Sequence, residues 1–306
     1  MSISFPQIKS DSLAVAMDSD LDFQYNSPIR CIGGKAKQVR YLATLMPDSI
    51  GHFYEPFGGG LSTTFFLIKT DRVKASMCHV GDLHEPQVNF FQVLQSEYEA
   101  LTEMLLETFP VNSNAARELF NKAVDQINAP GSPLEQAWGL YGFNRLAVMG
   151  IRRYEYNAYA SQAKESDSRL KIPHILRLPF FGELLQGVSI QVQSYSEALE
   201  DAAKHHGFIF LDPPYEGCDE MLYGAKFDFD EFAERCHAVT DKCSFMVTIN
   251  DSPRNRERFK FKGHQVFLRD VAYGLSSKTK QELVICNYKL DAQDYYLNHL
   301  GYQLVA

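Results

Sequence analysis

The 306-residue sequence has little cysteine and no long apolar run. Its six cysteines are scattered, without a C-x-x-C pair or a neighbouring group of histidines, so neither a disulfide framework nor a zinc site is indicated. No apolar stretch approaches the roughly 18 residues of a membrane span, and no basic region followed by an apolar one opens the chain. We therefore expect a cytoplasmic protein with reduced thiols and no metal.

Positive charge is scarce overall, and it is unevenly spread. The formal net charge of -8 argues against a general affinity for polyanions. Acids dominate between Asp82 and Glu135, whereas residues 145–177 and 254–280 are basic. Such stripes could hold a phosphate backbone while the rest of the surface repels it. That both stripes are simply solvated faces is an equally open alternative.

Short apolar runs alternate with helical patterns, which predicts an α/β sheet. A first strand ends at Glu55 and a second near Asp82, and apolar spacing predicts a helix over residues 86–109. Five strand-like runs follow residue 180, and the last two are close enough to form an antiparallel pair at one end of the sheet. Helical patterns fill the region between. We expect a core of residues 1–107 and 180–306, divided by a helical insertion of residues 108–179.

The stretch "GFIFLDPPYEG" shows where chemistry is expected. Its apolar residues 208–211 suit a strand covered on both faces, and the strand must stop at Asp212 because Pro213 and Pro214 cannot donate to a sheet ladder. In an open parallel sheet, ligands bind beyond the carboxyl ends of the strands. Asp212, the main-chain carbonyls of the prolines and Tyr215 are therefore predicted to lie at the functional edge.

A glycine-rich turn, Gly58 to Gly60, follows the first strand and precedes a helix. Glycines let the main chain approach a ligand closely, and the helix start presents free N–H groups. The spacing does not fit G-x-x-x-x-G-K-[ST], which disfavours a nucleoside triphosphate. Asp82, 22 residues after Gly60, is placed to bind a ribose diol, which favours a nucleoside-bearing cofactor. A plain helix cap is the competing interpretation of Asp82.

Taken together, "IGGK", "EPFGGGLS", "VGDLHEP" and "LDPPY" resemble, in order and spacing, the DNA adenine methyltransferase (Dam) family. The resemblance covers nearly the whole chain and continues through "LYGFNRLAVMGIRRYEYN", "SYSEAL" and "YGLSSKTKQELVICNY". It implies a Rossmann-like methyltransferase core with an end hairpin and an inserted helical target-recognition domain. The implied activity is transfer of the methyl group of S-adenosylmethionine to adenine N6 in double-stranded DNA, by in-line displacement after base flipping and without a metal.

The chemistry of this reaction accounts for the residue types after the strand. The amino nitrogen of adenine is a poor nucleophile because its lone pair is conjugated with the ring, so acceptors must draw on its two hydrogens. The carboxylate of Asp212 and the carbonyl of Pro213 are expected to supply them, with Pro214 fixing the local chain. Tyr215 is expected to stack on the everted base.

The resemblance also assigns binding residues. For the cofactor it indicates Lys35, Glu55, Phe57, Gly58, Gly59, Gly60, Asp82, Tyr195 and Asp212, with Lys35 approaching the cofactor carboxylate. Arg153 aligns with an arginine that the family uses against guanine. Phosphate contacts are expected from Arg145, Arg152, Ser276, Ser277, Lys278 and Lys280. For each of these cations and hydroxyls, a solvated surface position is the alternative.

The chain departs from the family in places. Cys31 stands where the family commonly has an aromatic, and Val148 and Met149 replace an aromatic wedge and a polar reader, so a GATC target does not carry over. The competing functions are N4-cytosine methylation, a catalytically silent DNA-binding relative, and methylation of RNA or of protein glutamine. Double-stranded DNA is the expected partner, in a bacterium or a phage-infected bacterial cell; a membrane is not, and a cognate restriction enzyme stays open.

Overall fold

The structure of the protein is a computed structural model, which describes residues 27–31, 33–108, 113–147, 154–155, 172–216, 227–272, 279–290 and 300–305. Among these residues, none of the helices is both long and apolar enough to cross a membrane.

A single mixed sheet of eight strands forms the centre of the described chain. The strands are β1 (Phe53–Glu55), β2 (Cys78–Asp82), β3 (Ser189–Val192), β4 (Phe208–Leu211), β5 (Ser244–Asn250), β6 (Gln265–Ala272), β7 (Thr279–Cys286) and β8 (Tyr302–Leu304). Their order across the sheet is β3-β2-β1-β4-β5-β7-β6-β8. The first five strands are parallel, whereas β7 runs antiparallel between β5 and β6, and β8 pairs antiparallel with β6. This is a Rossmann-like methyltransferase sheet with an antiparallel end.

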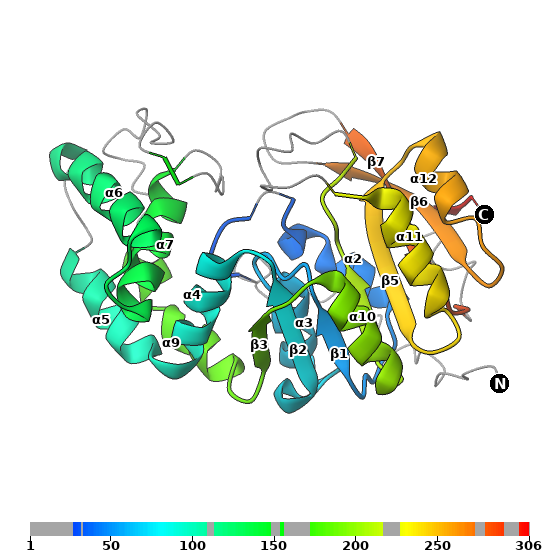
Figure 1. Cartoon of the computed structure of the whole chain (residues 1–306), viewed down its shortest axis with the longest axis horizontal. Coiled ribbons are helices and arrows are strands. Elements are labelled where there is room, and N and C mark those ends of the chain that lie inside the picture. The colour runs from blue at the N-terminus through cyan, green and yellow to red at the C-terminus, as the bar shows by residue number, and fades with distance from the viewer. Residues whose placement is uncertain are drawn as a thin grey trace.

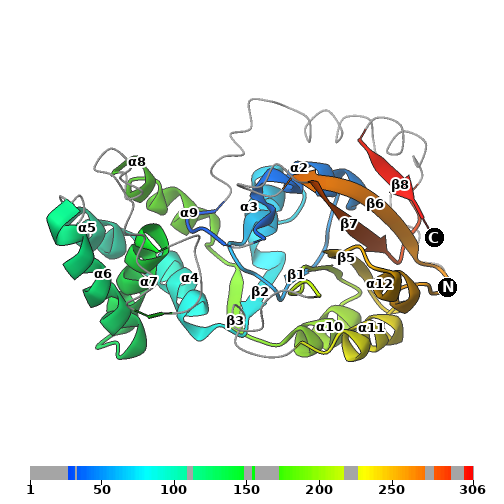
Figure 2. The same ribbon diagram turned by 90° about the horizontal axis from the view of Figure 1, so that it is seen from above.

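Helices cover both faces of the sheet and form a separate group at one end. They are α2 (Val39–Leu42), α3 (Ser62–Lys69), α4 (Glu85–Ser96), α5 (Tyr98–Thr108), α6 (Ser113–Asn128), α7 (Pro133–Leu146), α8 (Ile172–Ile175), α9 (Leu178–Leu184), α10 (Tyr195–Lys204), α11 (Phe229–Ala238) and α12 (Pro253–Arg258). Short 3₁₀ turns span Lys35–Lys37, Ala43–Leu45 and Ala75–Met77. Seen from above, α10 and α11 lie on one face of the sheet and α2 and α3 on the other (Figure 2). Helices α5 to α9 gather beyond the β3 edge (Figure 1).

Local sequence sets where several of these helices begin. Ser194 and Glu197 form a reciprocal capping box at the start of α10. Ser132 accepts the Glu135 N–H before α7, where Pro133 occupies the first helical position without needing a partner for an N–H. The side chain of Asp228 accepts two main-chain N–H groups at the start of α11. These short-range contacts fix the helices that cover the sheet.

Strand β4 is buried along its whole length, as its continuous apolar run predicted, whereas the edge strand β3 is partly exposed. Along β4, Phe208 and Phe210 face the core shared with α2 and α3, whereas Ile209 and Leu211 face the core under α10 and α11. The first of these cores continues without a break into helices α4 to α9. The helical group is thus packed onto the sheet through apolar side chains.

The predicted α/β sheet and its antiparallel end pair, β6 and β7, are confirmed. The single helix expected over residues 86–109 is wrong, because the chain forms α4 and α5 with a break at Glu97. A Cβ on Gly182 of α9 would lie 2.6 Å from the carbonyl of Leu94 and 2.5 Å from the ring of Tyr98. The close approach of a distant helix therefore coincides with the break, and periodicity alone does not reveal it. The domain boundaries at 107–108 and 179–180 stay predictions.

Candidate active site

The functional edge is the carboxyl edge of the parallel strands. β1 lies between β2 and β4, and β5 follows β4, so the residues after Glu55, Asp82, Leu211 and Asn250 all emerge at this edge. The glycine turn, Asp82 and the Asp-Pro-Pro-Tyr segment come from adjacent strands. A ligand site at the ends of the strands is what this topology favours.

The glycine turn is held against β2 by main-chain contacts. The Gly58 N–H donates to the Gly81 carbonyl over 2.8 Å, and a Cβ on Gly58 would come within 2.8 Å of the same oxygen, so only glycine fits there. Gly59 has a φ of 50° and donates its N–H to Oδ2 of Asp82 over 3.2 Å. The other carboxylate oxygen of Asp82 accepts the N–H of His84 over 3.1 Å. Asp82 therefore accepts an N–H just before α4, whose N-cap residue is His84, and it also lies beside the glycine turn. Its expected contact with a ribose diol stays a prediction.

Glu55 turns toward helix α3. Its Oε2 accepts the Thr64 N–H over 3.0 Å and also the Thr64 hydroxyl. Burial raises the pKa of Glu55 to about 7, although the hydrogen bonds from Thr64 act in the opposite sense. The contacts that the structure gives Glu55 thus anchor the helix behind the glycine turn.

Phe57 and Tyr195 lie together beside the glycine turn. Their rings are stacked with centroids 5.7 Å apart and planes inclined by 19°. Phe232 of α11 packs edge-on against both rings. Burial raises the pKa of Tyr195 to about 12. The structure thus brings together two residues that are far apart in the sequence and that were predicted to serve one cofactor.

Cys31 and Ser27 close the other side of the turn. A Cβ added to Gly60 would lie 2.5 Å from the hydroxyl oxygen of Ser27 and 3.5 Å from the sulfur of Cys31. The half-buried Cys31, at the position where an aromatic was expected, therefore forms part of the wall beside the glycines.

Within the described part of the chain, Lys35 and Thr248 both contact Oδ1 of Asp212. The Nζ of Lys35 forms an ion pair with it at 2.8 Å, and the buried Thr248 hydroxyl donates to it over 2.7 Å. Lys35 also donates to the Tyr215 hydroxyl over 2.7 Å, with Nζ 4.9 Å from the centre of that ring. The structure thus joins Asp212, Tyr215 and Lys35 in one cluster.

Lys35 lies between two carboxylates of the protein itself. Its Nζ lies 3.0 Å from Oε1 of Glu282 and 2.8 Å from Asp212, so both carboxylates attract the ammonium. That Lys35 approaches the cofactor carboxylate stays a prediction. Burial raises the pKa of Glu282 above its ordinary value, and the charge of Lys35 opposes that rise.

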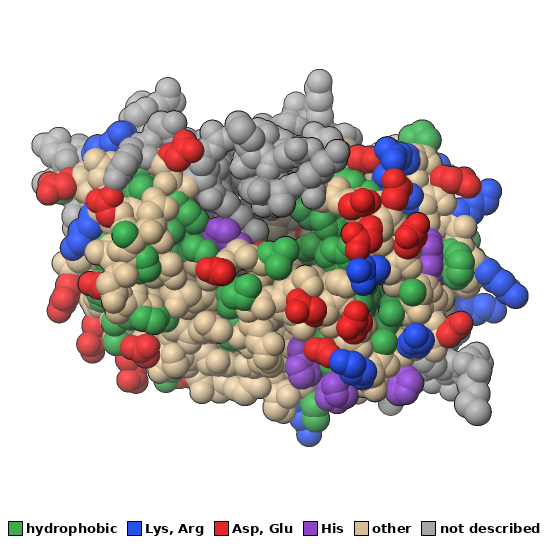
Figure 3. Space-filling view, viewed as in Figure 1, with side chains coloured by type: hydrophobic (Ala, Val, Ile, Leu, Met, Phe, Trp, Pro, Cys, Tyr) green, Lys and Arg blue, Asp and Glu red, His purple; other side chains and the backbone are tan. Residues whose placement is uncertain are grey.

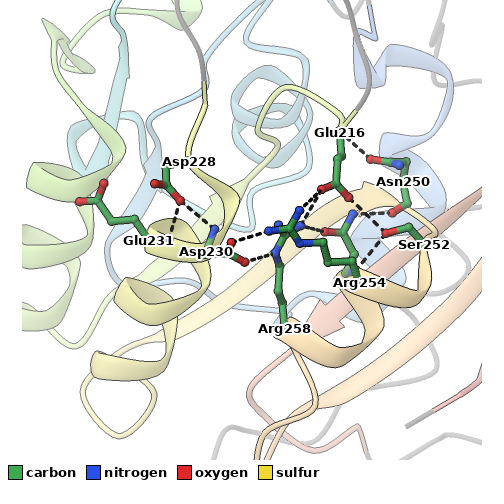
Figure 4. A network of polar contacts seen from close by, with 9 residues as sticks. Glu216, Asp228, Asp230, Glu231, Asn250, Ser252, Arg254 and Arg258 are labelled. Atoms are coloured by element: carbon green, nitrogen blue, oxygen red, sulfur yellow. Dashed lines mark hydrogen bonds and ion pairs between the residues drawn. The ribbon is translucent and has the colours of Figure 1, made fainter.

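A polar network supports the segment after Tyr215 (Figure 4). The Glu216 N–H donates to the side chain of Asn250 over 2.9 Å. The Glu216 carboxylate accepts from Nη1 of Arg258 over 3.1 Å, while Nε of Arg258 donates to Asp230 over 2.6 Å. Arg258 thus connects the catalytic strand end to the start of α11. Asn250, at the end of β5, thus supports the main chain of this segment.

The predicted DNA-contact residues divide into several groups. Arg145 is buried, and its Nη2 donates to the carbonyl of Pro28 over 2.6 Å, so the expectation that it contacts a phosphate does not agree with its place inside the protein. Lys280 is exposed at the start of β7. Arg152, Arg153, Ser276, Ser277 and Lys278 lie outside the described residues.

The structure shows where the acidic and basic stretches of the sequence lie and which of their charges are paired. Exposed Glu97, Glu99, Glu103 and Glu107 lie on or beside α5, and acidic side chains are visible along the outer edge of the helical group (Figure 3). In the basic stripe of residues 254–280, acids neutralise the arginines of α12: Arg254 pairs with Asp230 at 2.8 Å and Arg256 with Asp251 at 2.6 Å. Acidic and basic side chains accordingly alternate over α11 and α12 in Figure 3. The α12 part of this stripe is thus balanced locally.

Sequence reasoning missed three side chains of this site: Thr248, Glu282 and Arg258. A signal existed for the first two, since each is a polar residue inside an otherwise apolar strand, "SFMVTIN" and "ELVIC". A buried polar side chain normally has a specific partner. Within the described residues, no group of three or more His, Cys, Asp or Glu side chains could hold a metal ion.

The sheet order, the glycine turn after β1 and the Asp-Pro-Pro-Tyr segment after β4 define the class as a methyltransferase that acts on an exocyclic amino group. Comparison with known families is more specific. Residues 32–265 match the sequence model of the D12 class N6 adenine-specific DNA methyltransferase family, and the chain belongs to that family. It therefore methylates N6 of adenine in DNA, and N4-cytosine methylation and a silent DNA-binding role are set aside.

Two curated relatives are similar along most of their length. The chain is 25% identical over 274 residues to the type II methyltransferase M1.LlaDCHI of Lactococcus lactis subsp. cremoris. The matched residues cover 84% of this chain and 93% of the relative. The chain is 21% identical over 253 residues to the type II methyltransferase M.CviBI of Paramecium bursaria Chlorella virus NC1A, covering 77% and 92%.

Proposed function

We propose that the Asp212–Tyr215 segment receives an adenine everted from double-stranded DNA and that the glycine-turn side of the same edge holds S-adenosylmethionine. The observation that carries this proposal is the fixed orientation of Asp212 at the end of β4. Lys35 and Thr248 both contact its Oδ1. Among the described contacts of Asp212 this leaves Oδ2 to accept a hydrogen of the amino group.

Each residue of the Asp212–Tyr215 segment has a separate role in the proposed reaction. Asp212 and the main-chain carbonyl of Pro213 accept the two hydrogens of N6 and draw the nitrogen toward a tetrahedral geometry, in which its lone pair is released from the ring. Pro214 restricts the local chain. The ring of Tyr215 stacks on the base and offsets part of the few kcal/mol spent on unstacking it. Positioning of this kind is the main source of rate when no covalent intermediate is formed.

The cofactor side has the features that a nucleoside needs. Asp82 offers a carboxylate to a ribose diol, and the glycine turn allows close approach of the main chain. Phe57 and Tyr195 offer aromatic surface to an adenine ring. When bound, S-adenosylmethionine supplies the methyl: a nitrogen–carbon bond forms, the sulfur–carbon bond breaks with its electron pair left on sulfur, and N6 loses one proton. The carboxylate of Asp212, as a proposed acceptor of an N6 hydrogen, is assigned to take that proton.

DNA recognition is assigned to the helical insertion and to the loop between β6 and β7. Arg153 is proposed to contact guanine by the bidentate match to O6 and N7. Phosphate contacts are proposed for Arg152, Ser276, Ser277, Lys278 and Lys280, which fix orientation without reading sequence. Because both relatives carry names of type II methyltransferases, we also propose a role in restriction–modification, with a cognate restriction enzyme as partner.

The test uses the full chain, duplex DNA and S-adenosylmethionine with a tritiated methyl group. Label is expected in N6-methyladenine on nucleoside analysis. Asp212→Ala should retain cofactor affinity and lose transfer by several orders of magnitude, because transition-state contacts are lost and ground-state ones stay. Label found only in cytosine would overturn the assignment of the base, and equal loss of binding and transfer would overturn the role of Asp212.

A further inference from the structure

Glu282 is a buried acid to which the reaction described above gives no role. It lies on β7, an antiparallel strand that carries none of the residues predicted for catalysis or cofactor binding, and only 1% of its surface is exposed. Burying a carboxyl group is costly unless it is paired and hydrogen-bonded. Its partner is Lys35, whose Nζ lies 3.0 Å from Oε1 and which is itself 4% exposed.

The strand register brings Glu282 to the face on which Asp212 is held. Asn250 pairs directly with Glu282, and Thr248 lies two residues earlier on the same strand. Because side chains alternate along a strand, Thr248, Asn250 and Glu282 project from the same face. The 3₁₀ turn Lys35–Lys37 carries the lysine, which contacts Asp212 on one side and Glu282 on the other.

The ammonium of Lys35 lies within hydrogen-bond distance of three acceptor oxygens. An ammonium has three donor hydrogens, and Nζ lies 2.8 Å from Asp212 Oδ1, 2.7 Å from the Tyr215 hydroxyl and 3.0 Å from Glu282 Oε1. Two of these acceptors belong to residues that meet the target base in the proposed function. Glu282 is the third, and it comes from a different strand.

Without Glu282, the contacts with Asp212 and with the Tyr215 hydroxyl would remain of these three. The lysine stem is flexible and its charge is compact, so the ammonium could then move between the two carboxylate oxygens of Asp212. At Oδ2 it would occupy the position that the amino group of adenine needs. The contact with Glu282 draws Nζ toward β7 and therefore keeps it on the Oδ1 side.

We propose that Glu282 is a positioning residue for methyl transfer, which holds the ammonium of Lys35 by a hydrogen bond so that Lys35 fixes Asp212 and Tyr215 without entering the place of the target amino group. Glu282 touches neither substrate nor cofactor and acts only through Lys35. This inference rests on the proposed roles of Asp212 and Tyr215.

The test compares two substitutions at residue 282 in the full-length enzyme with duplex DNA. Glu282→Leu removes the acceptor at similar volume. Because removing one partner of a buried ion pair is destabilising, thermal unfolding checks that the variant is folded at the assay temperature. It should lower the single-turnover rate of methyl transfer about 10- to 100-fold and change the cofactor dissociation constant less than about 2-fold. Glu282→Gln keeps an oxygen acceptor in the same place and should restore the rate to within about 3-fold of the wild type. The exposed Glu200→Gln on α10 is the matched control.

A double substitution tests whether Glu282 acts through Lys35. If it does, Lys35→Met and Lys35→Met with Glu282→Leu should transfer methyl at equal rates, and this comparison applies even if Glu282→Leu alone does not fold. A further tenfold loss in the double variant would show an independent role and overturn the proposal. A wild-type rate for Glu282→Leu would do the same, as would a Gln variant as slow as the Leu variant. Absence of N6-methyladenine with the wild type would instead refute the proposed function.

Discussion

Thr248 donates its hydroxyl hydrogen to Oδ1 of Asp212 over 2.7 Å, one position beyond Val247 and Leu211, the last residues that pair β5 with β4. The donor therefore comes from β5 and the acceptor from the end of β4. Because Thr248 is fully buried, its hydroxyl is held in one position. Asp212 is therefore fixed by a residue of strand β5 as well as by Lys35.

Removing this hydroxyl should slow methyl transfer. Thr248→Val keeps the branched shape and removes the donor, and a hydrogen bond to a charged group contributes about 1.5–3 kcal/mol. We expect the single-turnover rate to fall about tenfold, with little change in cofactor affinity, because Lys35 still holds the carboxylate. Thr248→Ser keeps the hydroxyl and should stay within about threefold of the wild type. Equal rates for the Val and Ser variants would contradict a role for the hydrogen bond.

Arg258 should support the catalytic segment in a way that lysine cannot replace. Its Nε donates to Asp230, and its Nη1 donates to Glu216 and to Asn255 at 2.7 Å. A lysine presents a single point charge in place of this fork. Arg258→Lys should lower the free energy of unfolding by about 1–3 kcal/mol and the transfer rate about tenfold.

The matched control for that change is Arg254→Lys. Arg254 pairs with the same Asp230, yet 66% of its side chain is exposed, compared with 8% for Arg258. Exposed ion pairs contribute about 0–1 kcal/mol, so thermal unfolding and transfer by Arg254→Lys should be close to wild type. If the two variants lose stability and rate equally, the network does not position Glu216.

The sequence was most informative where the signal is local. Strand β4 ends at Leu211 because two prolines follow Asp212, and the glycine turn lies where the chain must approach Gly81 closely. Contacts between distant segments could not be found in this way. Nothing near Asp212 in the chain indicates that Lys35 and Thr248 contact it and that Glu282 contacts Lys35 in turn, since only the fold brings these distant segments together.

Cations were the least predictable residues. Arg145 reads as part of a basic stripe, but it lies in α7, where residues 137–146 are all buried, so its guanidinium is directed inward to Pro28. Arg254 and Arg256 likewise belong to a basic stretch, and both are paired with acids. Composition gives the sign of a charge, whereas the packing of each helix decides whether the charge reaches solvent.

Glu55 should make stability depend on pH. Its folded-state pKa is raised from 4.5 to about 7 by burial, so its contribution is fully present below pH 4.5 and is lost as pH rises through about 7. Glu55→Gln cannot titrate. Without cofactor or DNA, the variant should gain stability relative to the wild type between pH 5 and pH 8, by at most about 3 kcal/mol.

Thermal unfolding across that pH range measures the effect. The control is Glu183→Gln, which makes the same substitution at an exposed glutamate on α9. A Glu55→Gln curve parallel to that of the wild type would mean that the carboxyl group is ionised in the folded protein without cost.

Lys280 is the one predicted phosphate contact that is both described and exposed, so it offers a direct test of the DNA-facing surface. If it neutralises one phosphate, Lys280→Ala should weaken binding uniformly across duplex sequences. It should also reduce the slope of log K against log salt by about 0.9, because one fewer counterion is released. Titrations of a labelled duplex at several salt concentrations give that slope.

Lys204→Ala provides the comparison, because it removes the same charge from a different edge. Lys204 ends α10, which returns from the carboxyl edge to the opposite edge of the sheet, and 67% of its side chain is exposed. A charge on that side should leave the salt slope unchanged, even though the ion pair with Asp201 is lost. Equal slopes for both variants and the wild type would remove Lys280 from the DNA interface and restrict the phosphate contacts to other residues.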